Sequence, residues 1–287
     1  MSSTGDEDSN GLTAADTRPA VTRGLTFDEC LVFTIDAEWG HFRRVKGNVT
    51  KQTYRVMPRT TVAGLCAAIC GWDRDSYYGE FSPDRSAMAI EPLNDANHDI
   101  RTTNIPVNAL STAKEDFHNK YGHKTWPIPR VRLVDPTRKR QQHNYEVLVD
   151  PGYRIYVYLS GDLYDELRSH LSAGTSVYTT SLGLSEYLAS VTYEGETQVT
   201  HKSASEIDGK SVTSAVPMGP RHVAPKAGIP MSTERSPGFM ERVPGRAYQR
   251  RTTGFVNWTY SHTAESLTVT DDTPVSTVKG VGRVVFI

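Results

Sequence analysis

The chain has 287 residues, 37% of them hydrophobic, which is enough for one large domain or two small ones with a buried core. No run approaches the roughly 18 apolar residues of a membrane-spanning helix, and the acidic start MSSTGDEDSNGLTAAD is unlike a signal or transit peptide. The formal net charge is −1, but four of the 33 acidic residues lie within residues 1–17, so the rest of the chain contains 29 acidic and 32 basic residues. We therefore expect a cytoplasmic protein with no membrane contact and a mildly basic body.

The three cysteines, Cys30, Cys66 and Cys70, are predicted to be small core residues. They cannot all pair, and the last two are four residues apart on a predicted helix, where disulfide geometry is poor. A zinc site would need four ligands with closer pairing. The sequence therefore predicts no metal and no other cofactor.

The first part of the chain predicts a tail and a β-α-β unit. Residues 1–24 have few apolar residues, no periodicity and a cluster of acids, which is typical of a disordered tail. The continuous apolar run 30–36, CLVFTID, predicts a central strand. A helix over about 60–70 and a second strand over 86–93, SAMAIEPL, complete the unit.

The stretch 54–71, YRVMPRTTVAGLCAAICG, joins a basic segment to that helix. Pro58 keeps the preceding residue extended, so the helix is expected to begin after it, with Thr60 or Thr61 capping the first N–H groups. Arg59 stands beside the helix N-terminus, which is itself suited to bind phosphate. A strand-to-helix turn with a solvated arginine is the alternative interpretation.

Basic residues precede this turn without an acidic residue between Glu38 and Asp73, the pattern of a surface that faces a polyanion. They are Arg43, Arg44, Lys46, Lys51 and Arg55.

The next segment interrupts the β-α rhythm. Residues 94–143 are polar and rich in proline, and they include the basic run RVRLVDPTRKRQQH at 130–143. The returning arm 145–149 alternates as a hairpin strand does, so about 94–150 is predicted to be an inserted β-hairpin.

A second β-α-β unit follows, with a strand at 153–161, a helix at 162–174 and a strand at 188–195. The two units predict an α+β fold of the ferredoxin-like plan over 25–195, which RNA-recognition domains also use. Residues 196–287 lack helix signals and are predicted to form a smaller β-rich C-terminal lobe.

The sequence contains no nucleophile-elbow, zinc-protease or phosphate-loop motif, which leaves a binding module or a metal-independent ribonuclease. His118, His123 and Lys124 in the insertion could supply a base and a cation, or could simply be solvated. Tyr156 and Tyr158 could stack on bases or be half-buried, and the sequence leaves both alternatives open.

Three segments together resemble the CRISPR-associated RAMP proteins of the Cas-five type. They are AEWGHFRR at 37–44; YRVMPRTTVAGLCAAICG at 54–71, followed by DSYYGEF at 75–81; and TSLGLSEYLASV at 180–191. The Pro-Arg-Thr-Thr-x-x-Gly core is specific only in company with the other two. The resemblance covers most of residues 27–195 and does not explain residues 1–24 or the C-terminal lobe.

The resemblance implies a ferredoxin-like domain with a protruding thumb, in a type I complex of subtype B. It implies a subunit of Cascade, the antiviral interference complex, that caps the 5′ handle of CRISPR RNA beside the backbone and large subunits. Target DNA would be met only through that complex. Similar proteins in one subtype cleave repeat RNA, but their arrangement has no clear match here. The expected protein is therefore not an enzyme, and metal-independent cleavage of repeat RNA is the alternative.

The predicted RNA-binding residues come from the basic segment, the turn and the insertion. They are Arg43, Arg44, Lys46, Lys51, Tyr54, Arg55, Arg59, Thr60, Thr61, Arg130, Arg132, Arg138, Lys139 and Arg140. No residue is predicted to be catalytic or to bind a metal.

Overall fold

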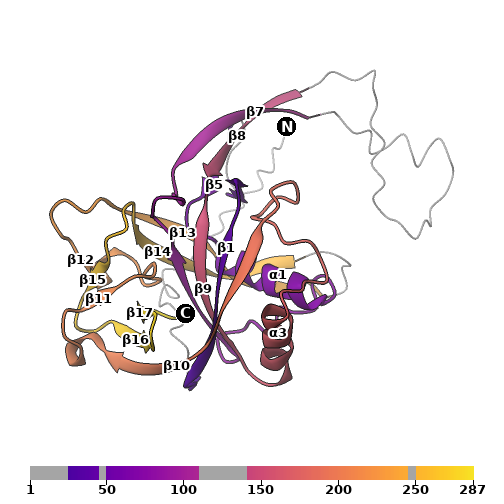
Figure 1. The fold of residues 1–287 in the computed structure, drawn as a ribbon. Coiled ribbons are helices and arrows are strands. Elements are labelled where there is room, and N and C mark those ends of the chain that lie inside the picture. Colours follow the sequence, from indigo (N-terminus) through magenta and orange to yellow (C-terminus); the bar gives the residue numbers. More distant parts are fainter. Residues whose placement is uncertain (1–24, 45–49, 110–140, 245–249) are drawn as a thin grey trace, which may run out of the picture.

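The computed structural model describes residues 25–44, 50–109, 141–244 and 250–287, which form a mostly β structure with two α-helices in those ranges (Figure 1). The elements up to the second helix are β1 (Glu29–Asp36), β2 (Trp39–Gly40), β3 (Phe42–Arg43), β4 (Thr50–Lys51), β5 (Thr53–Tyr54), α1 (Arg59–Cys70), β6 (Ser86–Pro92), β7 (Thr102–Ala109), β8 (Gln141–Val149), β9 (Gly152–Leu159) and α3 (Asp162–Ser172).

The remaining elements are strands and short 3-10 turns. They are β10 (Ser190–Ser203), η1 (Ala204–Glu206), β11 (Ser211–Val212), η2 (Pro220–His222), β12 (Val223–Ala224), β13 (Met231–Arg242), β14 (Arg250–Ser261), β15 (Leu267–Val269), β16 (Pro274–Val278) and β17 (Gly282–Val284).

The central sheet has the strand order β17-β16-β10-β1-β9-β6, and every neighbouring pair is antiparallel. The strands predicted at 30–36, 86–93 and 153–161 are confirmed as β1, β6 and β9. β10 is longer than predicted because it continues past residue 195 and pairs with β16 from Val199 to Ser203.

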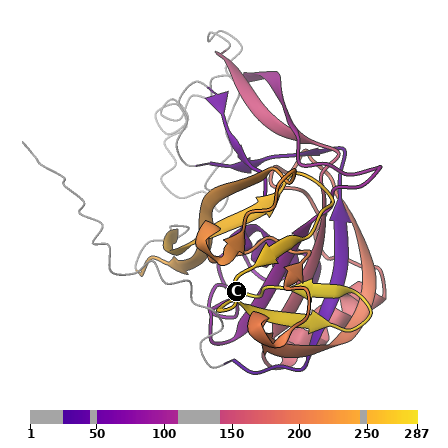
Figure 2. The ribbon, with the colours of Figure 1, turned by 90° about the vertical axis from the view of Figure 1, so that its left-hand side faces the viewer.

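Both faces of this sheet are covered, so alternate residues of its strands enter different cores. Leu31, Phe33 and Ile155 pack in the core that includes the buried residues of α1 and α3. Val32 and Tyr156 point to the other face, into a core that includes residues of β16 and β17. In Figure 1 the helices lie to the right of the sheet, and in Figure 2 the C-terminal strands lie in front of it.

A hairpin of β7 and β8 projects from the sheet within the segment predicted to be inserted (Figure 1). Its strands pair from Thr102 with Leu148 to Ala109 with Gln141. At its base, β8 also pairs with β2 and β4, which fixes the hairpin beside the basic segment that precedes α1.

The C-terminal part is continuous with the central sheet, although the sequence predicts a lobe that begins at residue 196. That boundary falls inside β10, and β16 and β17 extend the same sheet. The chain end pairs with β6, since Met88 and Ile287 exchange two backbone hydrogen bonds of 2.9 Å. The β13–β14 hairpin and the small β11-β15-β12 sheet lie outside it.

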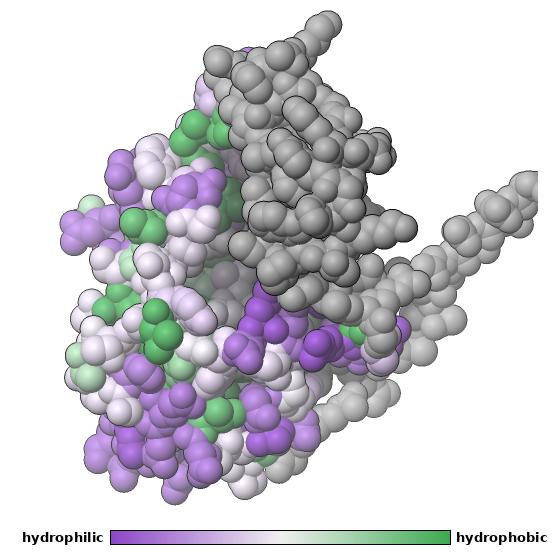
Figure 3. All heavy atoms as spheres, turned by 90° about the vertical axis from the view of Figure 1, so that its right-hand side faces the viewer, coloured by the Kyte–Doolittle hydropathy of each residue, from purple (hydrophilic) through white to green (hydrophobic). Residues whose placement is uncertain are grey.

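Helix α1 ends as the sequence indicates, because Gly71 adopts φ 76° at its C-cap. The three cysteines are buried and unpaired, and burial raises the pKa of Cys30 and Cys70 to about 12, which leaves these thiols unreactive. Neither helix of the described ranges has the length and hydropathy that crossing a bilayer requires. On the face shown in Figure 3, hydrophobic residues appear as separate spots among hydrophilic ones.

Candidate nucleic-acid interface

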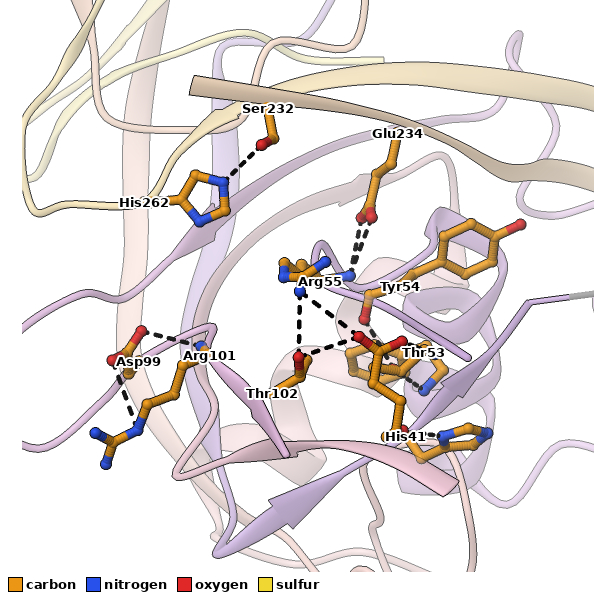
Figure 4. Close-up of polar contacts among 12 residues, drawn as sticks. His41, Thr53, Tyr54, Arg55, Asp99, Arg101, Thr102, Ser232, Glu234 and His262 are labelled. Carbon is orange, nitrogen blue, oxygen red and sulfur yellow. Dashed lines mark hydrogen bonds and ion pairs between the residues drawn. The ribbon is translucent and has the colours of Figure 1, made fainter. Parts of the chain in front are cut away.

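Two carboxylates from distant strands hold the connection between β5 and α1 (Figure 4). Glu234 of β13 accepts hydrogen bonds from the backbone N–H groups of Arg55 (3.0 Å) and Val56 (2.6 Å). Glu146 of β8 accepts one from the backbone N–H of Thr53 (3.2 Å). Burial raises the pKa of Glu234, and the two N–H groups oppose that rise. The connection is therefore fixed by side chains about 90 and 180 residues away in sequence.

The Arg55 side chain belongs to the same network. Its Nη2 donates to Thr102 Oγ1 (3.1 Å) and lies 3.6 Å from Glu146 Oε1. Its backbone carbonyl accepts a hydrogen bond of 2.5 Å from the hydroxyl of Tyr153. Arg55 thus connects β5 to the base of the β7–β8 hairpin, and 29% of its side chain stays exposed.

Helix α1 begins at Arg59, two residues earlier than a cap at Thr60 requires and three earlier than a cap at Thr61. Pro58 is the N-cap residue, and no side chain caps the first turn. Thr60 and Thr61 lie inside that turn, so their predicted capping role is wrong. The Thr60 hydroxyl lies instead 3.5 Å from the carbonyl of Pro237 on β13.

The structure contradicts the prediction that Arg59 contacts phosphate, because its side chain is 1% exposed. Its guanidinium donates to the carbonyl of Phe81 (2.6 Å) and to Ser86 Oγ (2.6 Å), and it lies over the Phe239 ring at 4.3 Å. Burial lowers its pKa to about 9. Arg59 therefore fastens α1 to the 81–86 turn and to β13.

Tyr54 is also buried, at 5% exposure, and burial raises its pKa. Its ring packs in the main core, and the Arg44 guanidinium carbon lies over it, 5.4 Å from the ring centroid. The prediction that Tyr54 contacts RNA is wrong in this conformation, although the arginine that it supports is half-exposed.

A groove of about 400 Å³ runs along one face of α1, from Thr60 to Ala68, and we call it the first groove. It is lined by Arg43 of β3, Thr60, Thr61, the segment 179–184 and Arg250 of β14. Arg43 is exposed, and its Nη2 lies 3.4 Å from the Tyr145 hydroxyl. Three predicted residues and part of the third resemblance segment therefore meet at one surface.

Gly183 shapes this groove from the side of the 179–184 segment. Its φ is +93°, and a Cβ there would run into the carbonyl oxygen of His41. The His41 ring is 1% exposed, its Nδ1 donates to the carbonyl of Glu146 (2.8 Å), and burial lowers its pKa. His41 is therefore a neutral structural residue below the groove.

Sequence reasoning missed three arginines that line the first groove or a second one. Arg250 lines the first groove, and its Nη1 donates to the Tyr78 hydroxyl (3.1 Å) and lies 3.5 Å from Asp75 Oδ1. Arg221 and Arg235 line a second groove, of about 520 Å³, together with Arg44. Adjacent basic residues at 250–251 were the only sequence signal for this region.

The other predicted residues are distributed as follows. Lys51 is half-buried on β4. Tyr156 is fully buried with its hydroxyl 2.5 Å from Glu91 Oε2, so it cannot stack on a base, and Tyr158 stacks on Phe27 with ring centroids 4.8 Å apart. Several predicted features lie outside the described residues: the tail 1–24, Lys46, His118, His123, Lys124, Arg130, Arg132, Arg138, Lys139 and Arg140.

Within the described ranges, no group of three or more His, Cys, Asp or Glu side chains could hold a metal ion.

Solved structures that are similar to this chain at low identity include the following three. A chain of a CRISPR RNA-guided surveillance complex is 12% identical, with TM-score 0.42, and the match covers 81% of this chain and 90% of that one. A CRISPR protein from Archaeoglobus fulgidus is 14% identical, with TM-score 0.43 and coverage of 89% and 98%. A chain of the Type III-B Cmr-beta complex bound to cognate target RNA and AMPPnP is 10% identical, with TM-score 0.40 and coverage of 83% and 86%.

No protein of curated function matches the sequence. The model of one protein family, described as CRISPR-associated protein (Cas_Cas5), matches residues 30–223, well over half of the 287 residues. The match begins in β1 and ends beyond the last of the three resemblance segments, so it contains all of them. It also includes α1, the β7–β8 hairpin and the 179–184 segment. The chain therefore belongs to the Cas5 family of CRISPR-associated proteins.

Proposed function

We propose that this protein is the non-catalytic subunit of a type I CRISPR interference complex that binds and caps the 5′ handle of CRISPR RNA. Its partners are that RNA and the backbone and large subunits, and target DNA is met through the assembled complex in the cytoplasm. Membership of the Cas5 family supports a place in such a complex. The first groove is the observation that supports RNA binding.

The first groove has the chemistry that a phosphate backbone requires. The groove runs along the face of α1 that carries Thr60, Thr61, Gly64, Leu65 and Ala68, so one wall is a helix side with two hydroxyls near its positive end. Arg43 and Arg250 add two cations, and the hydroxyls of Thr60 and Thr61 add hydrogen-bond partners. We assign handle phosphates to this surface, with Arg43 as the main contact because it is exposed and has no carboxylate within ion-pair distance among the described residues, whereas Arg250 lies 3.5 Å from Asp75.

The topology supports a ferredoxin-like core for this function. Strands β10, β1, β9 and β6 are neighbours in that order, and α1 and α3 connect β1 to β6 and β9 to β10. This is a twice-repeated β-α-β unit in one antiparallel sheet. The β7–β8 hairpin is then the thumb of about residues 94–150, and we propose that it contacts the RNA and the adjacent backbone subunit.

The alternative function, cleavage of repeat RNA without metal, requires a base, an acid and a cation at one reacting phosphate. His41 is the histidine that lines the first groove, and its buried ring is held by Glu146. The geometry of the first groove therefore favours binding without cleavage.

Incubation of the purified protein with repeat RNA in EDTA separates the two functions. We expect intact RNA from the wild type and from the variant in which His118, His123 and Lys124 are all replaced by alanine. Specific fragments that disappear in the triple variant would establish the endoribonuclease and overturn the proposal. Reconstitution with the other subunits and guide RNA completes the test, since Arg43→Ala should lower the RNA content of the complex and Arg168→Ala, a half-exposed cation on α3, should not.

A further inference from the structure

The outer face of the β13–β14 hairpin adjoins the second groove, because Arg235 and Asn257 belong to both. Most of this surface comes from the C-terminal part that the resemblance leaves unexplained, and Arg44 comes from the first resemblance segment. We infer that this surface is a second binding site, for the backbone and bases of single-stranded nucleic acid, apart from the first groove. The inference goes beyond the proposed function, which places the 5′ handle at the first groove.

Arginines from three separate parts of the chain converge on the second groove. Arg44 follows β3, Arg221 lies in η2, and Arg235 lies on β13. Each is at least partly exposed, so the fold holds three cations around a space of about 520 Å³. Such a cluster of mobile, planar cations attracts phosphate oxygens and releases the counterions bound to them.

The one acidic residue that lines this groove does not offset the arginines. Glu234 is 8% exposed, and its carboxylate faces inward, where it accepts the backbone N–H bonds of Arg55 and Val56. Outside the groove lining, the Asp272 carboxylate lies 3.6 Å from His222 Nδ1, beside Arg221, and is 73% exposed, so solvent screens its charge. The groove therefore keeps a net positive field.

The hairpin adds an aromatic platform next to these cations. Its inner residues, such as Val256 and Trp258, are buried in the main core, so the alternating residues Arg235, Phe255 and Asn257 face solvent. Phe255 is 45% exposed, and the Arg235 guanidinium lies over its ring at 4.5 Å.

The Arg235 guanidinium stacked on the Phe255 ring, flanked by the amide of Asn257, presents a flat plane with hydrogen-bonding groups at its edge. Successive bases stack on such platforms while arginines follow the phosphates. Arg44 forms the same type of pair with the ring of Tyr54 across the groove, at 5.4 Å. An acidic peptide would use the charges but not the two stacked planes, and nucleic acid uses both.

The test uses the full chain and a fluorescein-labelled 12-nucleotide oligouridine RNA, which has no base pairing and no handle sequence. Phe255→Ala should weaken binding roughly 5- to 100-fold, as the loss of one stacked base does, and Phe255→Tyr should restore it. The double variant Arg221→Ala with Arg235→Ala should reduce the dependence of log K on log salt by about 1.4, or about 0.7 for each lost phosphate contact. Arg168→Ala on α3 is the control that removes one half-exposed cation elsewhere, one that pairs with Asp165 and Glu196.

The variants change exposed side chains, so their melting temperatures should match the wild type within a few degrees. Wild-type affinity and salt dependence in both the Phe255→Ala and the double variant would overturn the inference, as would failure of the wild type to bind oligouridine. Variants that bind oligouridine normally but assemble poorly into the complex would also overturn the inference, because they would identify this surface as a protein interface. The proposed function is tested separately, by the preference of the protein for handle RNA over other RNA. Loss of that preference would refute the proposed function, whatever the oligouridine result.

Discussion

Replacing Glu234 with alanine should destabilise the protein far more than its position on a two-stranded hairpin suggests. The carboxylate satisfies the backbone N–H groups of Arg55 and Val56, and the second of these is completely buried. Each buried donor left without a partner costs about 1–3 kcal/mol. The half-exposed Arg55 N–H can recover part of its loss by bonding to water, so we expect the free energy of unfolding to fall by about 2–5 kcal/mol. This corresponds to a drop in melting temperature of roughly 5–15 °C.

Thermal and urea unfolding followed by circular dichroism measure this loss. Glu241→Ala is the matched control, because Glu241 lies on the same strand, is 43% exposed and, among the described residues, forms an ion pair with Arg251 at the surface. We expect that control to change stability by less than about 1 kcal/mol. Glu234→Gln keeps one acceptor oxygen and should fall between the two. Equal stability of Glu234→Ala and Glu241→Ala would refute the argument that the hairpin fixes the entry to α1.

Three further predictions concern the residues around the first groove. Gly183→Ala should lower the melting temperature and weaken RNA binding together, because the new Cβ would collide with the carbonyl of His41; normal stability would contradict the geometry. The pKa of His41 is lowered below its usual 6.5 in the folded state, so the unfolded chain takes up the proton first and stability falls as pH drops below about 6.5. Urea unfolding at several pH values should show a flatter profile for His41→Asn, and an unchanged profile would assign the pH dependence to other groups. Arg59→Ala should reduce the free energy of unfolding by about 2–4 kcal/mol, through the lost bonds to Phe81 and Ser86, while the folded variant keeps the wild-type salt dependence of RNA binding.

Local sequence patterns predict the elements that depend on local chemistry. The apolar run 30–36 indicates β1, because a strand buried on both faces must be mostly apolar. The period-two alternation of 153–161 indicates β9. Pro58 and Gly71 mark the two ends of α1 through their own backbone preferences.

The features that the sequence did not predict depend on partners far away in the chain. The burial of Arg59 requires acceptors at Phe81 and Ser86, and nothing near Arg59 in the sequence identifies them. Glu234 contacts a segment about 180 residues earlier. Such contacts arise only when the sheet brings these segments together, so Arg59 was predicted to be a surface cation and Glu234 was not predicted at all.

The same reasoning explains what was predicted of the site. Arg43, Thr60 and Thr61 could be chosen because basic residues and a helix start are visible locally. Arg250 could not, since only the pairing of β13 with β14 and the packing of β13 against α1 bring it to the first groove.

The central claim is that the first groove holds the 5′ handle, and equilibrium binding to handle RNA tests it most directly. The affinity of the wild type, Arg43→Ala and the Arg168→Ala control is measured for handle RNA and for a scrambled RNA of equal length over a series of salt concentrations. We predict that the wild type prefers handle RNA by about tenfold or more, the equivalent of one or two base contacts. We predict also that Arg43→Ala weakens binding and reduces the salt slope by about 0.7, and that Arg168→Ala does neither. Equal affinity of the wild type for both RNAs, or an Arg43→Ala variant that binds handle RNA as tightly and with the same salt slope as the wild type, would contradict the claim.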